Sequence, residues 1–164
     1  MFSAALLDEA ARLLEGFRTA QQRLVTAESC TGGLITALLT EIPGSSDVVE
    51  RGFVTYSNAA KQETLGVSAD ALAAHGAVSE AVARAMAEGA LVQSHADMAV
   101  SVTGIAGPSG SGEKKPIGLV HIAVARRAGA TLHRECRFGD IGRARIRLNS
   151  LKVALSLLRL ALAE

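Results

Sequence analysis

The sequence predicts an α/β fold: a single layered domain, spanning residues 1–164, with a mixed β-sheet flanked by helices. Short apolar segments rich in β-branched residues alternate with longer segments of helical periodicity, a pattern typical of strands joined by helices. Near the C-terminal end two strand-like segments follow one another directly, which indicates an antiparallel hairpin. A length of 164 residues provides for about one domain.

The N-terminal half begins with a segment in which Leu6, Ala10 and Phe17 recur at helical spacing after Ser3, a good N-cap residue. The predicted elements of this half are a helix over 4–20, a strand over 23–27, a helix over 34–40, a strand over 48–57 and a helix capped by Asn58. Polar turns separate these elements, so the order strand, polar turn, helix start occurs twice.

In the C-terminal half, Ser68 and Ser79 each precede a helical segment and are good N-cap residues. The predicted elements are helices over 68–75 and 79–95, a strand over 98–102, strands over 117–126 and 131–138 joined near Gly129, and a helix over 140–164. The last two strands supply the hairpin.

The last helix is apolar on several sides. One stripe consists of leucines at helical spacing, namely Leu148, Leu151, Leu155, Leu158 and Leu162. A helix of this kind is buried in the core or in a subunit interface. We therefore expect a homo-oligomer, and a dimer is the simplest form.

Composition excludes several classes of protein. Lys and Arg number 17 and Asp and Glu 16, which leaves a formal charge of +1 and no broad field for nucleic acid or an anionic membrane. With four Phe, one Tyr and no Trp, few side chains could stack on bases. Cys30 and Cys136 lie in unrelated contexts and fit neither a disulfide scaffold nor a zinc site. We expect a cytoplasmic protein that binds neither nucleic acid nor membrane.

Three polar segments follow predicted strands, at residues 28–33, 55–61 and 103–116, and the first and third of them contain glycine. Ligands of α/β proteins tend to bind beyond the carboxyl ends of the strands. The three segments are therefore predicted to form one site.

The first segment offers Ser29, Cys30 and Thr31 as nucleophiles, while Gly32 and Gly33 allow a tight turn that leaves backbone N–H groups exposed at a helix start. Simple N-capping by Ser29 or Thr31 is an alternative. Cys30 is intrinsically the better nucleophile, and a helix start would lower its pKa, although small cysteines are often simply buried.

The second segment contains Tyr56 and Lys61 across a strand-to-helix junction, with Lys61 in the first helical turn. There the helix dipole disfavours a positive charge, and partial burial would lower the lysine pKa further. A neutral lysine can accept a proton from a serine hydroxyl. The alternative is a solvated surface lysine.

The third segment could bind a phosphate through backbone N–H groups, although it lacks a P-loop ending and could equally be a flexible hairpin loop. Arg143 and Arg147 share one helix face, where an anion would compensate their charge, whereas Arg145 lies on another face. Solvated arginines are the alternative. The four histidines show no metal-ligand spacing, so we predict neither a catalytic metal nor a cofactor.

Six ordered blocks of the sequence closely resemble the CinA C-terminal domain family. The blocks are residues 26–33 (TAESCTGG), 44–46 (GSS), 51–58 (RGFVTYSN) with Lys61, 75–80 (HGAVSE), 101–108 (SVTGIAGP) and 115–120 (KPIGLV). The resemblance covers nearly the whole chain from Leu24 onward. One departure is a two-residue insertion, Ile141-Gly142, before Arg143.

This resemblance implies the activity of the stand-alone family members, hydrolysis of nicotinamide mononucleotide to nicotinic acid mononucleotide and ammonia. It implies Ser29 as nucleophile, Lys61 as base and Tyr56 as an assisting residue. Longer members carry an N-terminal domain linked to pyrophosphatase activity and competence, and we do not expect that activity here. For binding of the nucleotide, the resemblance implies Thr31, Gly32, Gly33, Thr103, Gly104, Ile105, Ala106, Gly107, Arg143 and Arg147.

Two other functions stay open at the level of sequence. A regulatory module could bind a nucleotide in the same pocket without chemistry, although such a module has no need of an activated serine. A serine amidase could instead act on another phosphorylated amide. An assay of ammonia release with several amides separates these possibilities.

Overall fold

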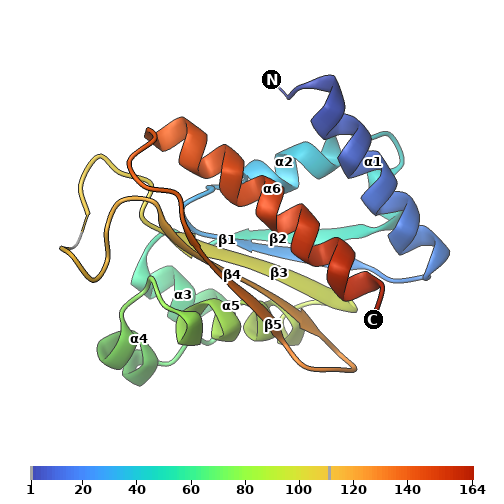
Figure 1. The fold of residues 1–164 in the computed structure, drawn as a ribbon. Coiled ribbons are helices and arrows are strands. Elements are labelled where there is room, and N and C mark those ends of the chain that lie inside the picture. The colour runs from blue at the N-terminus through green and yellow to red at the C-terminus, as the bar shows by residue number, and fades with distance from the viewer. Residues whose placement is uncertain (1, 111) are drawn as a thin grey trace.

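A computed structural model describes residues 2–110 and 112–164 of the chain. It contains one five-stranded sheet with the strand order β2-β1-β3-β4-β5 (Figure 1). The strand β1 pairs in parallel with both β2 and β3, whereas β3, β4 and β5 pair antiparallel. The predicted α/β fold with a mixed sheet and a C-terminal hairpin is therefore confirmed.

The helices and strands follow the predicted order. In chain order they are α1 (Ala4–Thr19), β1 (Leu24–Glu28), α2 (Leu34–Thr40), the short 3₁₀ helix η1 (Ser45–Asp47), β2 (Val49–Val54), α3 (Asn58–Leu65), α4 (Ala69–His75), α5 (Glu80–Val92), β3 (Met98–Gly104), β4 (Leu119–Arg126), β5 (Leu132–Arg137) and α6 (Arg143–Leu162).

Helices cover both faces of the sheet. The helices α1, α2 and α6 lie on one face, and α3, α4 and α5 lie on the other (Figure 1). Alternate residues of β1 contribute to the two cores, because Leu24 packs under α1 and α6 whereas Val25 and Ala27 pack against α5. Glu28 therefore faces the α2 side.

Several boundaries differ from the predicted ones for local reasons. The strand β2 ends at Val54, and Ser57 rather than Asn58 caps α3, since the Ser57 hydroxyl accepts a hydrogen bond from the Ala60 N–H. The last helix starts at Arg143 rather than at residue 140, because Gly142 has a φ of 90° that a helix does not accommodate.

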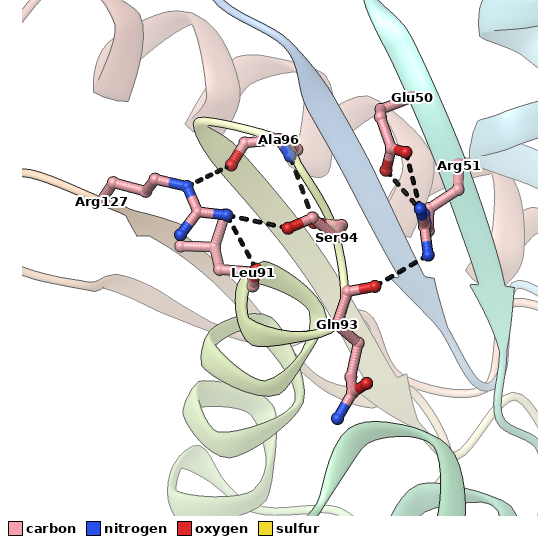
Figure 2. A network of polar contacts seen from close by, with 7 residues as sticks. All are labelled: Glu50, Arg51, Leu91, Gln93, Ser94, Ala96 and Arg127. Atoms are coloured by element: carbon pink, nitrogen blue, oxygen red, sulfur yellow. Dashed lines mark hydrogen bonds and ion pairs between the residues drawn. The ribbon is translucent and has the colours of Figure 1, made fainter.

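The helix α5 stops at Val92 rather than at residue 95, and two arginines bind the backbone that follows it (Figure 2). The Arg127 guanidinium donates to the carbonyl groups of Leu91, Ser94 and Ala96, and Arg51 donates to that of Gln93. Carbonyl groups at a helix end have no helical partner, so these cations stabilise the end of α5.

Most of the leucine stripe of α6 is buried in the core, as Leu151, Leu155 and Leu158 show exposed fractions of 1% or less. The core alone therefore accounts for these side chains, and the dimer stays a prediction. Within the described part of the chain, none of the helices is both long and apolar enough to cross a membrane.

Candidate active site

Residues of all three polar segments come together at the carboxyl ends of β1, β2 and β3, the third segment through Thr103, Gly104 and Ala106, whereas its Ser111 lies outside the described residues. Because β1 is parallel to both neighbours, all three strands end at the same edge of the sheet. A cavity of about 230 Å³ lies there. Its lining comprises Ser29, Cys30, Tyr56, Asn58, Lys61, Ala77, Val78, Thr103, Gly104, Ala106 and Arg143.

Two buried side chains meet in this cavity. The Lys61 ammonium nitrogen Nζ lies 3.0 Å from the Ser29 hydroxyl and donates to the Thr55 carbonyl at 2.8 Å. Ser29 is 8% exposed and Lys61 only 1% exposed. The alternative of a solvated surface lysine is therefore wrong.

Burial lowers the pKa of the Lys61 ammonium below its usual range. Lys61 lies in the first turn of α3, where the helix dipole also disfavours its charge. Among the ion pairs of the described residues, none includes Lys61. A larger neutral fraction follows, and a neutral amine can accept the Ser29 proton.

The backbone fixes the positions of both groups. The Ser29 N–H donates to the Val102 carbonyl of β3, and the Thr55 N–H donates to the Glu28 carbonyl, both at 2.9 Å. Since the Thr55 carbonyl also binds Lys61, one residue of the segment after β2 connects the base to the residue before the nucleophile.

Cys30 does not share this reactivity. Its side chain packs in the core beneath α1, α2 and α6. Burial raises the pKa of the Cys30 thiol to about 12, so the expected lowering by a helix start does not occur. The thiolate is the reactive form, and Ser29 is therefore the better candidate nucleophile of the two.

The start of α2 is capped by a side chain that the sequence analysis did not identify. Gly33 is the N-cap residue, and neither Ser29 nor Thr31 caps the helix, so that alternative is wrong. The buried Glu28 carboxylate instead accepts hydrogen bonds from the N–H groups of Gly33, Ile35 and Thr36. An acidic residue at the end of an otherwise apolar strand was the available signal.

At the mouth of the cavity Tyr56 is 61% exposed. Its hydroxyl accepts a hydrogen bond from Arg143 at 2.9 Å, and Arg143 also donates to the Gly107 carbonyl at 2.7 Å. Arg143 therefore connects the loop after β3 with the segment after β2. Although the Ile141-Gly142 insertion precedes it, Arg143 lies on the cavity wall.

Arg147 lies one turn further along α6 and donates to the Thr31 carbonyl at 2.7 Å. This hydrogen bond stabilises the turn after Ser29, and Arg147 itself is not part of the cavity lining. Thr103 lines the cavity, and its hydroxyl donates to the Ala77 carbonyl at 2.8 Å.

A model of the family described as CinA C-terminal domain matches residues 7–162. The chain belongs to this CinA family. A CinA-like protein of Anaeromyxobacter sp. (strain K) is 52% identical over 141 residues, which cover 86% of this chain and 34% of that protein. A CinA-like protein of Mycobacterium sp. (strain JLS) is 51% identical over 96% of this chain and 36% of its own length. The chain thus spans about a third of these relatives.

Solved structures of the CinA superfamily share the fold. The crystal structure of competence/damage inducible protein CihA from Agrobacterium tumefaciens has a TM-score of 0.96 and 51% identity, covering 100% of this chain and 99% of that one. The CinA superfamily protein KP700603 from Klebsiella pneumoniae has a TM-score of 0.91 and 34% identity, covering 96% and 98%.

The lining of the cavity does not include every residue predicted to bind substrate. Thr31, Gly32, Gly33, Ile105, Gly107 and Arg147 are outside its lining, and their binding roles stay predictions. Three backbone N–H groups near Ser29 are already engaged: that of Gly32 binds the Ser29 carbonyl, that of Gly33 binds Glu28, and that of Ile105 binds the Leu119 carbonyl. Within the described residues, no group of three His, Cys, Asp or Glu side chains could hold a metal ion.

Proposed function

We propose that this CinA-family chain is an amidohydrolase that converts nicotinamide mononucleotide to nicotinic acid mononucleotide and ammonia through a serine nucleophile. The observation that carries the proposal is the buried Lys61 amine 3.0 Å from the Ser29 hydroxyl. A binding module gains nothing from burying a lysine without a carboxylate partner, since burial of a cation costs free energy. The substrate follows from the resemblance to the stand-alone family members.

In the first half of the reaction, Ser29 Oγ attacks the carboxamide carbon and its proton passes to Lys61. The carbon–nitrogen bond then breaks, and Lys61 returns the proton to the leaving nitrogen, which departs as ammonia. In the second half, water attacks the acyl-enzyme ester and passes a proton to Lys61. The ester bond to Ser29 Oγ then breaks, Lys61 returns the proton to this oxygen, and the carboxylic acid is released. One proton-transfer group therefore serves both halves.

The developing oxyanion needs fixed N–H donors. Among the hydrogen bonds of the described residues, the Cys30 and Thr31 N–H groups engage neither a carbonyl nor a side-chain acceptor. These two groups directly follow the nucleophile in the chain. They are our candidates for the oxyanion hole, where a single donor is worth about 3 kcal/mol.

Recognition of the nucleotide is proposed for the other side of the cavity. Arg143 supplies a cation on the wall, and Thr103, Gly104 and Ala106 line the part next to β3. A phosphate on Arg143 would distinguish a nucleotide from free nicotinamide, because guanidinium groups bind phosphate through paired N–H donors. Tyr56 assists at the cavity mouth, where its hydroxyl holds Arg143.

The test is ammonia release from nicotinamide mononucleotide by purified wild-type protein and by Ser29→Ala, with a chelator present. We expect release by the wild type and a loss on the order of 10⁴-fold or more in Ser29→Ala, with binding and folding retained. Retained activity in Ser29→Ala would move the nucleophile to another group. Saturable nucleotide binding by an inactive wild type would instead support a regulatory module.

A further inference from the structure

Glu28 is the last residue of β1 and directly precedes Ser29. Its side chain is fully buried on the α2 side of the sheet, whereas Ser29 lies against Lys61 of α3 on the opposite side. Burying a carboxylate is unfavourable unless its oxygens receive hydrogen bonds. The contacts of this carboxylate therefore show what its burial achieves.

The Glu28 carboxylate accepts four hydrogen bonds, all from the start of α2. The donors are the N–H groups of Gly33, Ile35 and Thr36, at 3.0, 3.1 and 2.9 Å, and the Thr36 hydroxyl at 2.9 Å. The Thr36 hydroxyl also lies 2.6 Å from that of Thr26. These bonds satisfy N–H groups that a helix start leaves without partners.

The segment between Glu28 and α2 carries the nucleophile, and Glu28 holds it at both ends. At one end it is joined covalently to Ser29, and at the other its carboxylate binds the Gly33 N–H. Within the segment, Gly32 and Gly33 have φ values of 60° and 91°, a left-handed conformation that glycine adopts without steric cost and that allows the tight turn. The Glu28 carbonyl also receives the N–H of Thr55, whose carbonyl binds Lys61.

We propose that Glu28 is a positioning residue that orients the Ser29 hydroxyl toward Lys61 by fixing the turn between β1 and α2. The inference rests on the proposed role of Ser29 as nucleophile, and it assigns a role in the same reaction to a residue outside the cavity. A misplacement of about 1 Å can lower a rate by about 100-fold, so a loss of this support is measurable in kcat.

The decisive variant is Glu28→Gln, which keeps the side-chain volume but presents an NH₂ group where a carboxylate oxygen accepted hydrogen bonds. We expect kcat to fall about 100-fold with KM unchanged, since the substrate cavity does not include Glu28. The matched control is Thr36→Val, which removes the hydroxyl bonds to Glu28 and Thr26 but leaves the three backbone bonds. Its kcat is expected to stay near that of the wild type.

A second readout is independent of the substrate. A fluorophosphonate labels an activated serine: Ser29 Oγ forms a bond to phosphorus, fluoride leaves, and the hydroxyl proton passes to Lys61. We expect Glu28→Gln to slow labelling about 100-fold and Thr36→Val to label at the wild-type rate. A purely structural role would lower the melting temperature of both variants and leave the labelling rate of the folded protein unchanged.

Folded Glu28→Gln that labels at the wild-type rate would overturn the proposal, as would an equal slowing in Thr36→Val. If Glu28→Gln does not fold, Glu28→Asp replaces it, and labelling at the wild-type rate by that shorter carboxylate would likewise overturn it. Labelling of wild-type Ser29 without ammonia release would refute only the proposed substrate. Absence of labelling in the wild type would refute the nucleophile and the positioning role together.

Discussion

The two ends of the sheet both bind cations to backbone carbonyl groups, but with opposite consequences. At the end where α5 stops, Arg51 and Arg127 bind the carbonyl groups of Leu91, Gln93, Ser94 and Ala96, and hydrogen bonding to Glu50 raises the pKa of Arg51 (Figure 2). At the carboxyl ends of β1 and β2, Lys61 binds the Thr55 carbonyl, and burial lowers its pKa.

This difference distinguishes a structural cation from a reactive one. Arg51 keeps its charge because it remains near solvent and has an acidic neighbour. Lys61 is buried and has a hydroxyl as its second partner, and burial lowers its pKa and so increases its neutral fraction. The local environment of each cation, rather than its formal charge, therefore indicates which end of the sheet is the candidate for the proposed chemistry.

The largest expected difference in kcat between the two ends is seen when the cation of one end and that of the other are removed in separate variants. Lys61→Met should lower kcat on the order of 10³-fold, because general-base assistance is lost. Arg51→Met, the matched control, should leave kcat unchanged, since the hydrogen bonds of Arg51 in the described part of the chain go to Glu50 and the Gln93 carbonyl. Steady-state ammonia release checks both, and a modest loss in Lys61→Met would reduce Lys61 to a positioning role.

The second effect is on pH dependence. Because Lys61 must be neutral to act as base, kcat/KM should rise about tenfold per pH unit until the pH passes its lowered pKa. A pH–rate profile measures this rise, and Lys61→Met should lose it. A wild-type profile that shows no rise anywhere from acidic to alkaline pH would contradict a lysine base.

The same shift affects stability with a definite sign. In the window between the lowered pKa of folded Lys61 and the usual lysine value, the unfolded chain binds more protons than the folded one. The free energy of unfolding should therefore gain a contribution that increases with pH in this window. Denaturant titrations of wild type and Lys61→Met at several pH values measure it, and identical pH dependence would contradict the shift.

A smaller effect is expected from the arginines of α6. Arg143→Ala should raise KM about tenfold, with a smaller change in kcat, because it removes a charged donor from the cavity wall. Arg147→Ala is predicted to raise KM as well, although Arg147 contacts the Thr31 carbonyl rather than the cavity. The exposed Arg145 is the control, and unchanged KM values for Arg143→Ala would exclude it from phosphate binding.

The smallest effect belongs to the structural end. Arg127→Met should lower the free energy of unfolding by about 1 kcal/mol, because three carbonyl groups lose a partly exposed donor. Its kcat should match that of the wild type. Denaturant titration and ammonia release measure the two quantities, and a loss of kcat would show that the two ends are coupled.

The fold could be predicted from the sequence, and so could the site formed by the three polar segments after β1, β2 and β3, because both depend on local patterns. A strand followed by a polar segment occurs three times, and parallel pairing brings the strand ends to one edge. Lys61 was identifiable because a lysine in a first helical turn is unfavourable unless it has a function.

Contacts between residues far apart in the chain could not be predicted in this way. The burial that raises the pKa of Cys30 depends on helices from both ends of the chain, and the contact between Arg147 and Thr31 spans 116 residues. The capping role of Glu28 requires its carboxylate to lie beside the first N–H groups of α2, which depends on the path of the chain between β1 and α2. Local periodicity contains no information on these contacts.

The most direct test of the account is to identify both products from one reaction of wild-type protein with nicotinamide mononucleotide, with a chelator present. Cleavage of the amide bond predicts equal amounts of ammonia and nicotinic acid mononucleotide, measured by a coupled assay and by NMR. Free nicotinamide with ribose phosphate, or unchanged substrate in the presence of folded protein, would contradict an amidase centre formed by Ser29 and Lys61.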